Sequence, residues 1–335
     1  MSSYTSSSEN TEGAEWGRWL GVFLGALAFG AALVFALVLI VDPYDSGRVG
    51  ILGIRGVDDA SPRTANASRA RDPQFDSAVI GNSTGQLLKP SELSALTGNS
   101  FVQLTVPGTG PREQLAIMDF FVRRHARPGA VVIVTDASWC QRDPALPLRH
   151  PFPFWLYGDS NLGYIARLFS SRALRLTSRR LMVAFGLRRR SAPDGYWDYE
   201  KEGPAEVVLG PRDDGGPAPP EVSGDFPAAR LLDAAVKALP PEVPVVLVIP
   251  PAFYSAIPRP GTLASAEETA CRAALARLVA GRPHSNFINF RIENEFTRER
   301  ANFIDFGHYR AVIARKMEKA IAESIRLGDR AKIEF

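Results

Sequence analysis

The chain is poor in cysteine and histidine, with only 2 Cys and 4 His among 335 residues. Two cysteines cannot hold together a chain of this length, which excludes the small proteins stapled by disulfides. No group of His, Cys, Asp and Glu has the spacing of a metal site. Neither a phosphate-binding G-x-x-x-x-G-K-[ST] nor a strand-linked G-x-G-x-x-G is present. We therefore expect neither a metal nor a cofactor.

An excess of charge of one sign is also missing. The 39 basic residues nearly balance the 36 acidic ones, and a net charge of +3 argues against a nucleic-acid partner. The 28 Gly and 26 Pro follow no period, which excludes a collagen-like chain. Length alone allows either two domains or one large α/β domain.

The chain does contain one long apolar segment near its N-terminus. Residues 19–41 are 23 consecutive positions without a charge. A helix of that length spans roughly 34 Å, enough for the ~30 Å hydrocarbon core of a bilayer. Trp16 and Trp19 at one edge and Tyr44 beyond the other suit the interfacial aromatic belts. We predict a transmembrane helix over 16–41, which contacts the bilayer through 19–41.

A cleavable signal peptide fits this segment less well. Its apolar region would be about 7–15 residues long and followed by small residues, whereas this run ends at Asp42. The first 15 residues are rich in Ser and Glu, and we expect them to be disordered. Arg18 on one flank and Arg48 and Arg55 on the other do not decide the orientation by the positive-inside rule.

After a polar, Arg-rich juxtamembrane linker over 42–73, short apolar runs alternate with helical periodicity. Near-continuous apolar strands separated by helices indicate an α/β fold with a parallel sheet covered on both faces. We predict a flavodoxin-like three-layer α/β/α domain over 74–330, with a mainly parallel five-stranded sheet. The predicted strands are 75–80, 101–105, 130–135, 245–249 and 287–290. The predicted helices are 90–96, 111–124, 227–239, 264–280 and 309–326.

An insertion at about 138–225 separates the third and fourth strands. Its second half is loop-like and rich in Gly, Pro and Asp. In its first half, between Asp159 and Asp194, eight arginines occur without an acid, in a basic amphipathic pattern. These arginines could cover apolar neighbours on a solvated helix face, or they could contact anionic lipid headgroups or an anionic glycan. Nucleic acid is the least favoured alternative.

Candidate catalytic residues follow the first and last strands. Functional residues of a parallel α/β sheet lie on loops beyond the carboxyl ends of the strands. The first strand runs into Gly81-Asn82-Ser83, which places a hydroxyl at that edge, and a following helix would offer N–H groups to an oxyanion. Asp305 and His308 follow the fifth strand. A serine needs a base, and the base needs an acid to fix its tautomer, so we expect the loop to bring His308 over Ser83.

These two motifs resemble the first and last blocks of the SGNH (GDSL-type) hydrolases and acyltransferases, over about residues 75–326. The resemblance implies Ser83 as nucleophile, His308 as general base and Asp305 as the acid that orients it. It also implies an oxyanion hole formed at Ser83 and at a glycine after the second strand. Gly108 is the best match for that glycine, and Gly110 is the alternative.

The chain departs from the family pattern in two places. Asn82 stands before the proposed nucleophile where the family usually has Asp. The third block of the family, Gly-x-Asn-Asp, supplies an asparagine to the oxyanion hole, whereas residues 135–139 read Thr-Asp-Ala-Ser-Trp. Either another donor takes its place or the oxyanion hole is weaker.

With its single N-terminal anchor, the chain resembles the membrane-anchored SGNH-like proteins that act with membrane-bound O-acyltransferases on cell-envelope polymers. The resemblance implies a single-pass protein of the cytoplasmic (inner) membrane with an extracytoplasmic, periplasmic domain. We expect a serine esterase or O-acyltransferase that removes or transfers an acyl group, expected to be acetyl, on a glycan or acylated small molecule. A membrane-bound O-acyltransferase is the expected partner. The sequence does not choose between hydrolysis and transfer.

Two other functions stay open. The protein could be a non-catalytic glycan-binding or scaffold subunit of a polysaccharide-modification complex, with a vestigial triad. It could also be a lipid-directed esterase that uses the basic segment at the membrane surface.

Several further residues resemble site residues in type or sequence context. Ser160 belongs to a second Gly-Asp-Ser string, but it follows proline-broken sequence, and we predict it to be the N-cap of a basic helix. His125, His150 and His284 lie at a helix end or in Pro-flanked loops, and we assign them no catalytic role.

Two remaining features are left open by the sequence. Cys140 and Cys271 could pair in an oxidising compartment, which their spacing does not decide. The Pro-Pro pair at 250–251, followed by Phe253 and Tyr254, could line an acyl or sugar pocket or simply end the fourth strand.

Overall fold

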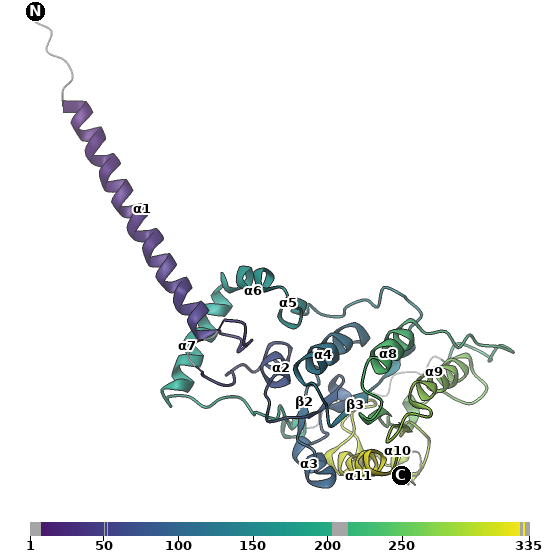
Figure 1. Cartoon of the computed structure of the whole chain (residues 1–335). Coiled ribbons are helices and arrows are strands. Elements are labelled where there is room, and N and C mark those ends of the chain that lie inside the picture. The colour runs from purple at the N-terminus through teal and green to yellow at the C-terminus, as the bar shows by residue number, and fades with distance from the viewer. Residues whose placement is uncertain (1–7, 50, 52, 203–213, 329–330, 332–335) are drawn as a thin grey trace, which may run out of the picture. The chain divides into compact units, whose positions relative to one another are not determined.

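The computed structural model describes residues 8–49, 51, 53–202, 214–328 and 331. These residues form two units, and most of the helices are labelled in Figure 1. The anchor unit contains the chain up to Arg55 together with Ser160–Arg188. The α/β unit contains Gly56–Asp159 and the chain from Arg189 onward. The predicted insertion is therefore divided between the two units.

A parallel sheet forms the centre of the α/β unit. Its strands lie in the order β2-β1-β3-β4-β5, and every neighbouring pair is parallel. All five predicted strands are confirmed, with ends shifted by at most two residues. Their bounds are β1 Ser77–Ile80, β2 Phe101–Gln103, β3 Ala130–Val134, β4 Val245–Ile249 and β5 Asn286–Asn289.

The five predicted helices are also present. They are α3 Pro90–Thr97, α4 Pro111–Arg124, α8 Pro227–Lys237, α9 Leu263–Val279 and α11 Ala311–Leu327. Two short helices, α5 Phe154–Tyr157 and α10 Glu295–Arg298, add to them.

Helices cover both faces of the sheet. On one face, alternate strand residues such as Val132 and Val246 join one buried cluster with side chains of α3 and α11, Met317 among them. The intervening residues point to the opposite face because side chains alternate along a strand. There α4 contacts β1, α9 contacts β4, and α8 packs against both of these helices. The α/β fold class is thereby confirmed.

One helix lies in the segment predicted to be a linker. α2 Pro62–Ala70 packs against α4, and its buried side chains are alanines and small polar residues. Asn66, which is fully buried, donates from Nδ2 to the carbonyl oxygen of Thr105 at 3.2 Å. Because α2 buries polar groups rather than an apolar stripe, its sequence carries no helical hydrophobic pattern.

The anchor unit is built on one long helix, α1 Ser8–Val41. Residues Glu15–Val41 are long and apolar enough to cross a membrane, and only 11% of the most apolar window is buried. A core helix of a soluble protein would be mostly buried. Residues 8–15, predicted to be disordered, continue the helix, since extending an existing helix is far easier than starting one. The rest of that predicted tail lies outside the described residues.

Two helices of the basic segment pack against α1. They are α6 Asn161–Leu168 and α7 Ser171–Ala184. Arg180 of α7 is only 2% exposed, and its guanidinium donates to the carbonyl oxygens of Val41, Asp42 and Ile54. A cation at this end of α1 satisfies terminal carbonyls and complements the helix dipole. One arginine of the basic segment is therefore structural.

Burial of Glu318 in α11 should make the α/β unit less stable as the pH rises. Its carboxylate accepts from the N–H of Lys89 at 2.6 Å and pairs with Arg315 at 2.9 Å. Burial outweighs these contacts and raises the pKa of Glu318 to about 7 from the ordinary 4.5. Between these two values the folded chain holds a proton that the unfolded chain releases, so stability falls across this window as the pH rises and is constant above it.

A Glu318→Gln variant should lose this pH dependence. We expect the variant to match the wild type near pH 4 and to be more stable by up to about 3 kcal/mol at about pH 8. Thermal unfolding of both proteins across this pH range checks the difference. A variant that is less stable than the wild type at about pH 8 would contradict it.

Candidate active site

The turn after β1 positions Ser83. Gly81 precedes it, and a Cβ on Gly81 would lie 2.9 Å from the Cβ of Val134 and 3.0 Å from its carbonyl oxygen. Only glycine permits this close approach of β1 to β3. Ser83 begins a single 3₁₀ turn, Ser83–Gly85, and α3 starts only at Pro90. The expected helix directly after the serine is therefore replaced by one turn.

Asn82 connects the turn to the loop after β3. Its Oδ1 accepts from the N–H of Thr84 at 3.0 Å and from the Thr84 hydroxyl at 2.8 Å. Its Nδ2 donates to the carboxylate of Asp136. Asp136 also accepts from the N–H and the hydroxyl of Ser138. Asn82 thus has a structural role: its amide donates to Asp136, which an aspartate carboxylate at the same position could not do.

Gln103 of β2 holds the other end of the same turn. It is buried, and its Nε2 lies 2.7 Å from the carbonyl oxygen of Gln86 and 2.8 Å from that of Leu88. The backbone after Ser83 is therefore fixed by a side chain of a neighbouring strand.

The structure brings Ser83, His308 and Asp305 into one hydrogen-bonded series. His308 Nε2 lies 2.9 Å from Ser83 Oγ, and His308 Nδ1 lies 2.8 Å from Asp305 Oδ2. A proton on Nδ1 that is donated to Asp305 leaves Nε2 free to accept from the serine hydroxyl. The side chains of His308 and Asp305 are 31% and 29% exposed, so the series is open to solvent.

Asp305 is held in its charged form. Burial acts to raise its pKa, but hydrogen bonds from the His308 ring and from the N–H groups of Gly307 and His308 outweigh burial, and the pKa falls below its usual range. An ionised Asp305 can fix the tautomer of His308 and stabilise its imidazolium form.

Two tyrosines position the histidine loop, and neither was expected from the sequence. The buried Tyr309 donates from its hydroxyl to the carbonyl oxygen of Thr84 at 2.6 Å, which joins the loops that carry His308 and Ser83. Tyr199 donates to the carbonyl oxygen of Tyr309 at 3.2 Å, and its ring packs edge-on against His308. The adjacency of Tyr309 to His308 could have drawn attention to it, whereas no sequence signal marks Tyr199.

The two candidate glycines after β2 differ in their contacts. The N–H of Gly110 donates to Glu113 Oε2 at 3.1 Å and is therefore engaged. Gly108 has a φ of +69°, which favours glycine, and a Cβ there would lie 2.9 Å from Cδ2 of His150. Among the described residues, no hydrogen bond uses the N–H of Ser83 or Gly108. Gly108 thus remains the better candidate, and His150, which had no assigned role, borders it.

A cavity of about 540 Å³ lies beside the chain neighbours of Ser83 and His308. Thr84 and Gly307, the chain neighbours of Ser83 and His308, form part of its wall. Its remaining wall is mostly apolar, with Ile249, Phe306 and several proline and alanine side chains; the charged residues are Asp136, Arg149, Glu267, Glu268 and Arg291.

The loop after β4 contributes its prolines to this cavity but not its aromatic rings. Pro250 and Pro251 line the wall. Phe253 is buried instead against Phe303, with ring centroids 5.7 Å apart, and Tyr254 packs under the guanidinium of Arg298.

The second candidate serine and two of the remaining histidines make their contacts outside this hydrogen-bonded series. Ser160 caps α6 by accepting from the N–H of Gly163 at 3.0 Å, as predicted, and belongs to the anchor unit. His125 Nε2 contacts the carbonyl oxygen of Ala70, and His284 Nδ1 contacts that of Arg326.

A disulfide joins two elements of the cavity wall. Cys140 ends the 3₁₀ turn Ala137–Cys140 after β3 and bonds to the fully buried Cys271 of α9. This settles the pairing that the sequence left open. Among the described residues, no group of three or more His, Cys, Asp and Glu could hold a metal ion. Comparison with protein-family models and with curated proteins gave no match.

Proposed function

We propose that this protein is a membrane-anchored serine esterase or O-acyltransferase with an SGNH-like domain. The observation that carries the proposal is the series from Ser83 Oγ through His308 to Asp305 at the carboxyl edge of the sheet. The strand order β2-β1-β3-β4-β5 is that of flavodoxin-like sheets, which bind ligands at this edge, where the order reverses. It supports a flavodoxin-like, SGNH-type domain.

The proposed reaction has two halves. In the first, His308 Nε2 takes the proton of Ser83 as Oγ attacks the ester carbonyl, and His308 then returns that proton to the leaving alcohol. In the second, His308 deprotonates water or an acceptor hydroxyl, which attacks the acyl-enzyme and releases Ser83 with its proton restored. Asp305 stabilises the imidazolium in both halves. The N–H groups of Ser83 and Gly108 are the proposed donors to the oxyanion.

The proposed oxyanion hole has one donor fewer than the SGNH pattern implies. Asp136 stands in the third-block position, and a carboxylate that already accepts from Asn82 and Ser138 cannot donate to an oxyanion. One such donor is typically worth about 10²–10³ in rate. We therefore expect slow acyl transfer, and the missing donor is also what favours the alternative of a non-catalytic glycan-binding or scaffold subunit.

The charged side chains of the cavity wall support a glycan as the carrier of the acyl group. Two arginines and three carboxylates contribute to its wall, with Glu268 held 2.9 Å from Arg291. Charged and hydrogen-bonding groups suit a hydroxyl-rich ligand, and the apolar part of the wall suits an acyl group. We propose a short acyl group, such as acetyl, carried by a glycan.

The disulfide supports an extracytoplasmic position for the α/β unit. Disulfides persist in oxidising compartments and are rare in the cytoplasm. With α1 as a single membrane-spanning helix, we propose that the unit lies on the periplasmic side of the cytoplasmic membrane. A membrane-bound O-acyltransferase remains the proposed partner.

A serine-reactive fluorophosphonate probe tests the proposal. The wild type and a Ser160→Ala control should be labelled, since Ser160 only caps α6. A Ser83→Ala variant with an unchanged melting temperature should not be labelled. Equal labelling of Ser83→Ala and wild type would disprove the role of Ser83, and a folded wild type that resists the probe would favour the non-catalytic alternative.

A further inference from the structure

The pair of helices α6 and α7 exposes an unusual amount of apolar surface. The exposed fraction reaches 82% for Leu162 and 71% for Phe169. Four more large apolar side chains of this segment are exposed: Leu174, Met182, Phe185 and Leu187. We call residues 161–187 the hairpin. Exposed apolar surface of this density marks a site of interaction with a protein or a membrane.

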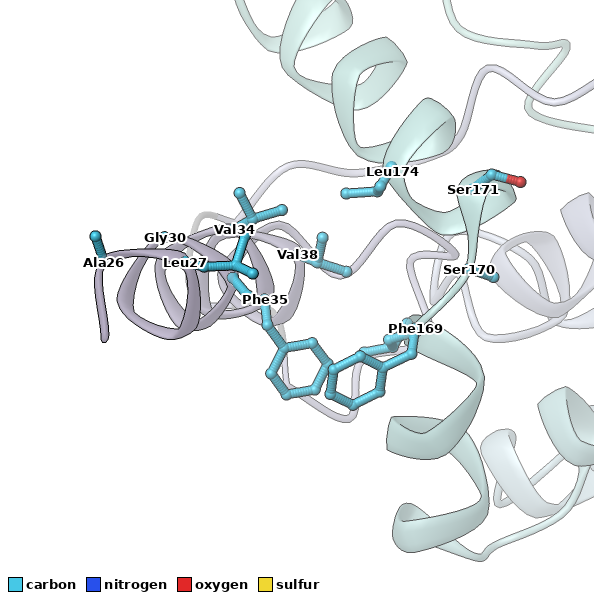
Figure 2. A pocket seen from close by; sticks show the side chains of 12 residues that line it. Ala26, Leu27, Gly30, Val34, Phe35, Val38, Phe169, Ser170, Ser171 and Leu174 are labelled. Carbon is cyan, nitrogen blue, oxygen red and sulfur yellow. The ribbon is translucent and has the colours of Figure 1, made fainter. Parts of the chain in front are cut away.

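A groove separates the hairpin from α1. Its volume is about 660 Å³. Figure 2 shows Phe35 and Phe169 ring to ring at one wall and Leu174 at the other, and the two rings are stacked with centroids 3.9 Å apart. The lining is apolar except at Ser170 and Ser171, which lie at the start of α7.

The part of α1 that lines the groove would lie within the hydrocarbon layer of a membrane that α1 crosses. Phe35 precedes the last residue of the helix, Val41, by six positions, which is roughly 9 Å along the axis. The charge-free run that ends at Val41 is about as long as the hydrocarbon core is thick, so the core must extend nearly to Val41. A ring stacked on Phe35 is then inside the hydrocarbon layer of the leaflet next to Asp42.

Cations flank the groove-lining part of the hairpin. Arg167 and Arg175, both exposed, stand immediately before and after residues 168–174. No acidic residue occurs between Asp159 and Asp194. Apolar side chains beside arginines, without acids, are the composition of an amphipathic segment that lies in the interface of an anionic membrane.

We propose that the hairpin binds an anionic phospholipid, with an acyl chain in the groove and its phosphate held by Arg167 and Arg175. The inference requires α1 to cross a membrane and does not use the Ser83 site. A transmembrane helix of another protein is a poorer occupant, because the groove extends only from Ala26 to Val38 and Phe169 closes one wall.

Native mass spectrometry of the full chain tests the proposal. The protein is reconstituted into nanodiscs with equal amounts of phosphatidylglycerol and phosphatidylcholine, released into detergent, and the retained lipids are counted. We expect about tenfold more phosphatidylglycerol than phosphatidylcholine on the wild type. Arg167→Gln with Arg175→Gln should remove this preference, and Phe169→Ala with Leu174→Ala should reduce the retention of both lipids.

The matched control changes two exposed arginines of the α/β unit, Arg127→Gln and Arg300→Gln. It should retain lipid as the wild type does. Equal retention of the two lipids by the wild type, or an equal loss in the control, would overturn the proposal. A change of oligomeric state in the Phe169→Ala and Leu174→Ala variant, without loss of lipid, would instead assign the groove to contact between copies of this chain.

Discussion

A His308→Ala variant should hydrolyse p-nitrophenyl acetate at least about 10³-fold more slowly than the wild type. General-base assistance accounts for much of the rate of a serine enzyme, because the hydroxyl of Ser83 is a poor nucleophile while it keeps its proton. Asp305→Asn should also lose a large factor, since an amide would no longer hold the proton on His308 Nδ1. Steady-state rates of purified full-length proteins measure both effects.

A double variant tests whether Ser83 and His308 act together. Residues that act as a unit have strongly non-additive effects, so Ser83→Ala with His308→Ala should be about as slow as Ser83→Ala alone. His284→Ala provides the histidine control, because its ring contacts only the carbonyl oxygen of Arg326 among the described hydrogen bonds. The acyl-enzyme mechanism fails if the hydrolysis rate of His308→Ala stays within about tenfold of the wild-type rate. It also fails if the rate losses of the two single variants multiply in the double variant.

Removal of the disulfide should produce the largest loss of stability. The two cysteines are 131 residues apart in the chain. The chain-entropy account of disulfides assigns about 5 kcal/mol to a loop of this length. For a domain of this size, such a loss lowers the melting temperature by roughly 10–20 °C. Cys140→Ala with Cys271→Ala should show this shift in thermal unfolding.

Reduction of the wild type is the matched experiment. Dithiothreitol should lower the melting temperature of the wild type to that of the double variant and leave the variant unchanged. Because Cys140 also lines the cavity beside Ser83, reduction should slow fluorophosphonate labelling as well. A wild type whose melting temperature does not respond to dithiothreitol would contradict the predicted contribution.

The elements that were predicted correctly carry a local pattern of burial. β4 consists of five buried aliphatic residues, Val245–Ile249, and α4 begins with a proline and ends with arginines. Such patterns depend on neighbours within one element and can be seen in the sequence. Ser83 and His308 could be named for a related reason. Each follows a recognisable strand, and parallel strands bring such loops to one edge.

The features that were missed depend on contacts between distant segments. α2 buries Asn66 against Thr105, which no hydrophobic period reveals. Tyr199 reaches the histidine loop from the insertion, 110 positions away from Tyr309. Arg180 stands in a stretch of arginines typical of a solvated helix face, yet its side chain is buried and donates to carbonyl groups at the end of α1. In each case a polar group is satisfied by a partner that local sequence does not identify.

The anchor unit also imposes an order on biosynthesis. Its helix α1 leaves the ribosome first, but the hairpin that contacts it begins only at residue 161, after β1, β2 and β3 have been made. Since chains fold from the N-terminus as they are synthesised, α1 forms without the guanidinium that later caps it. The carbonyl groups of Val41 and Asp42 at its end lack this partner until Arg180 has been synthesised. Closure of the anchor unit is therefore a late event, which follows the synthesis of three strands of the sheet.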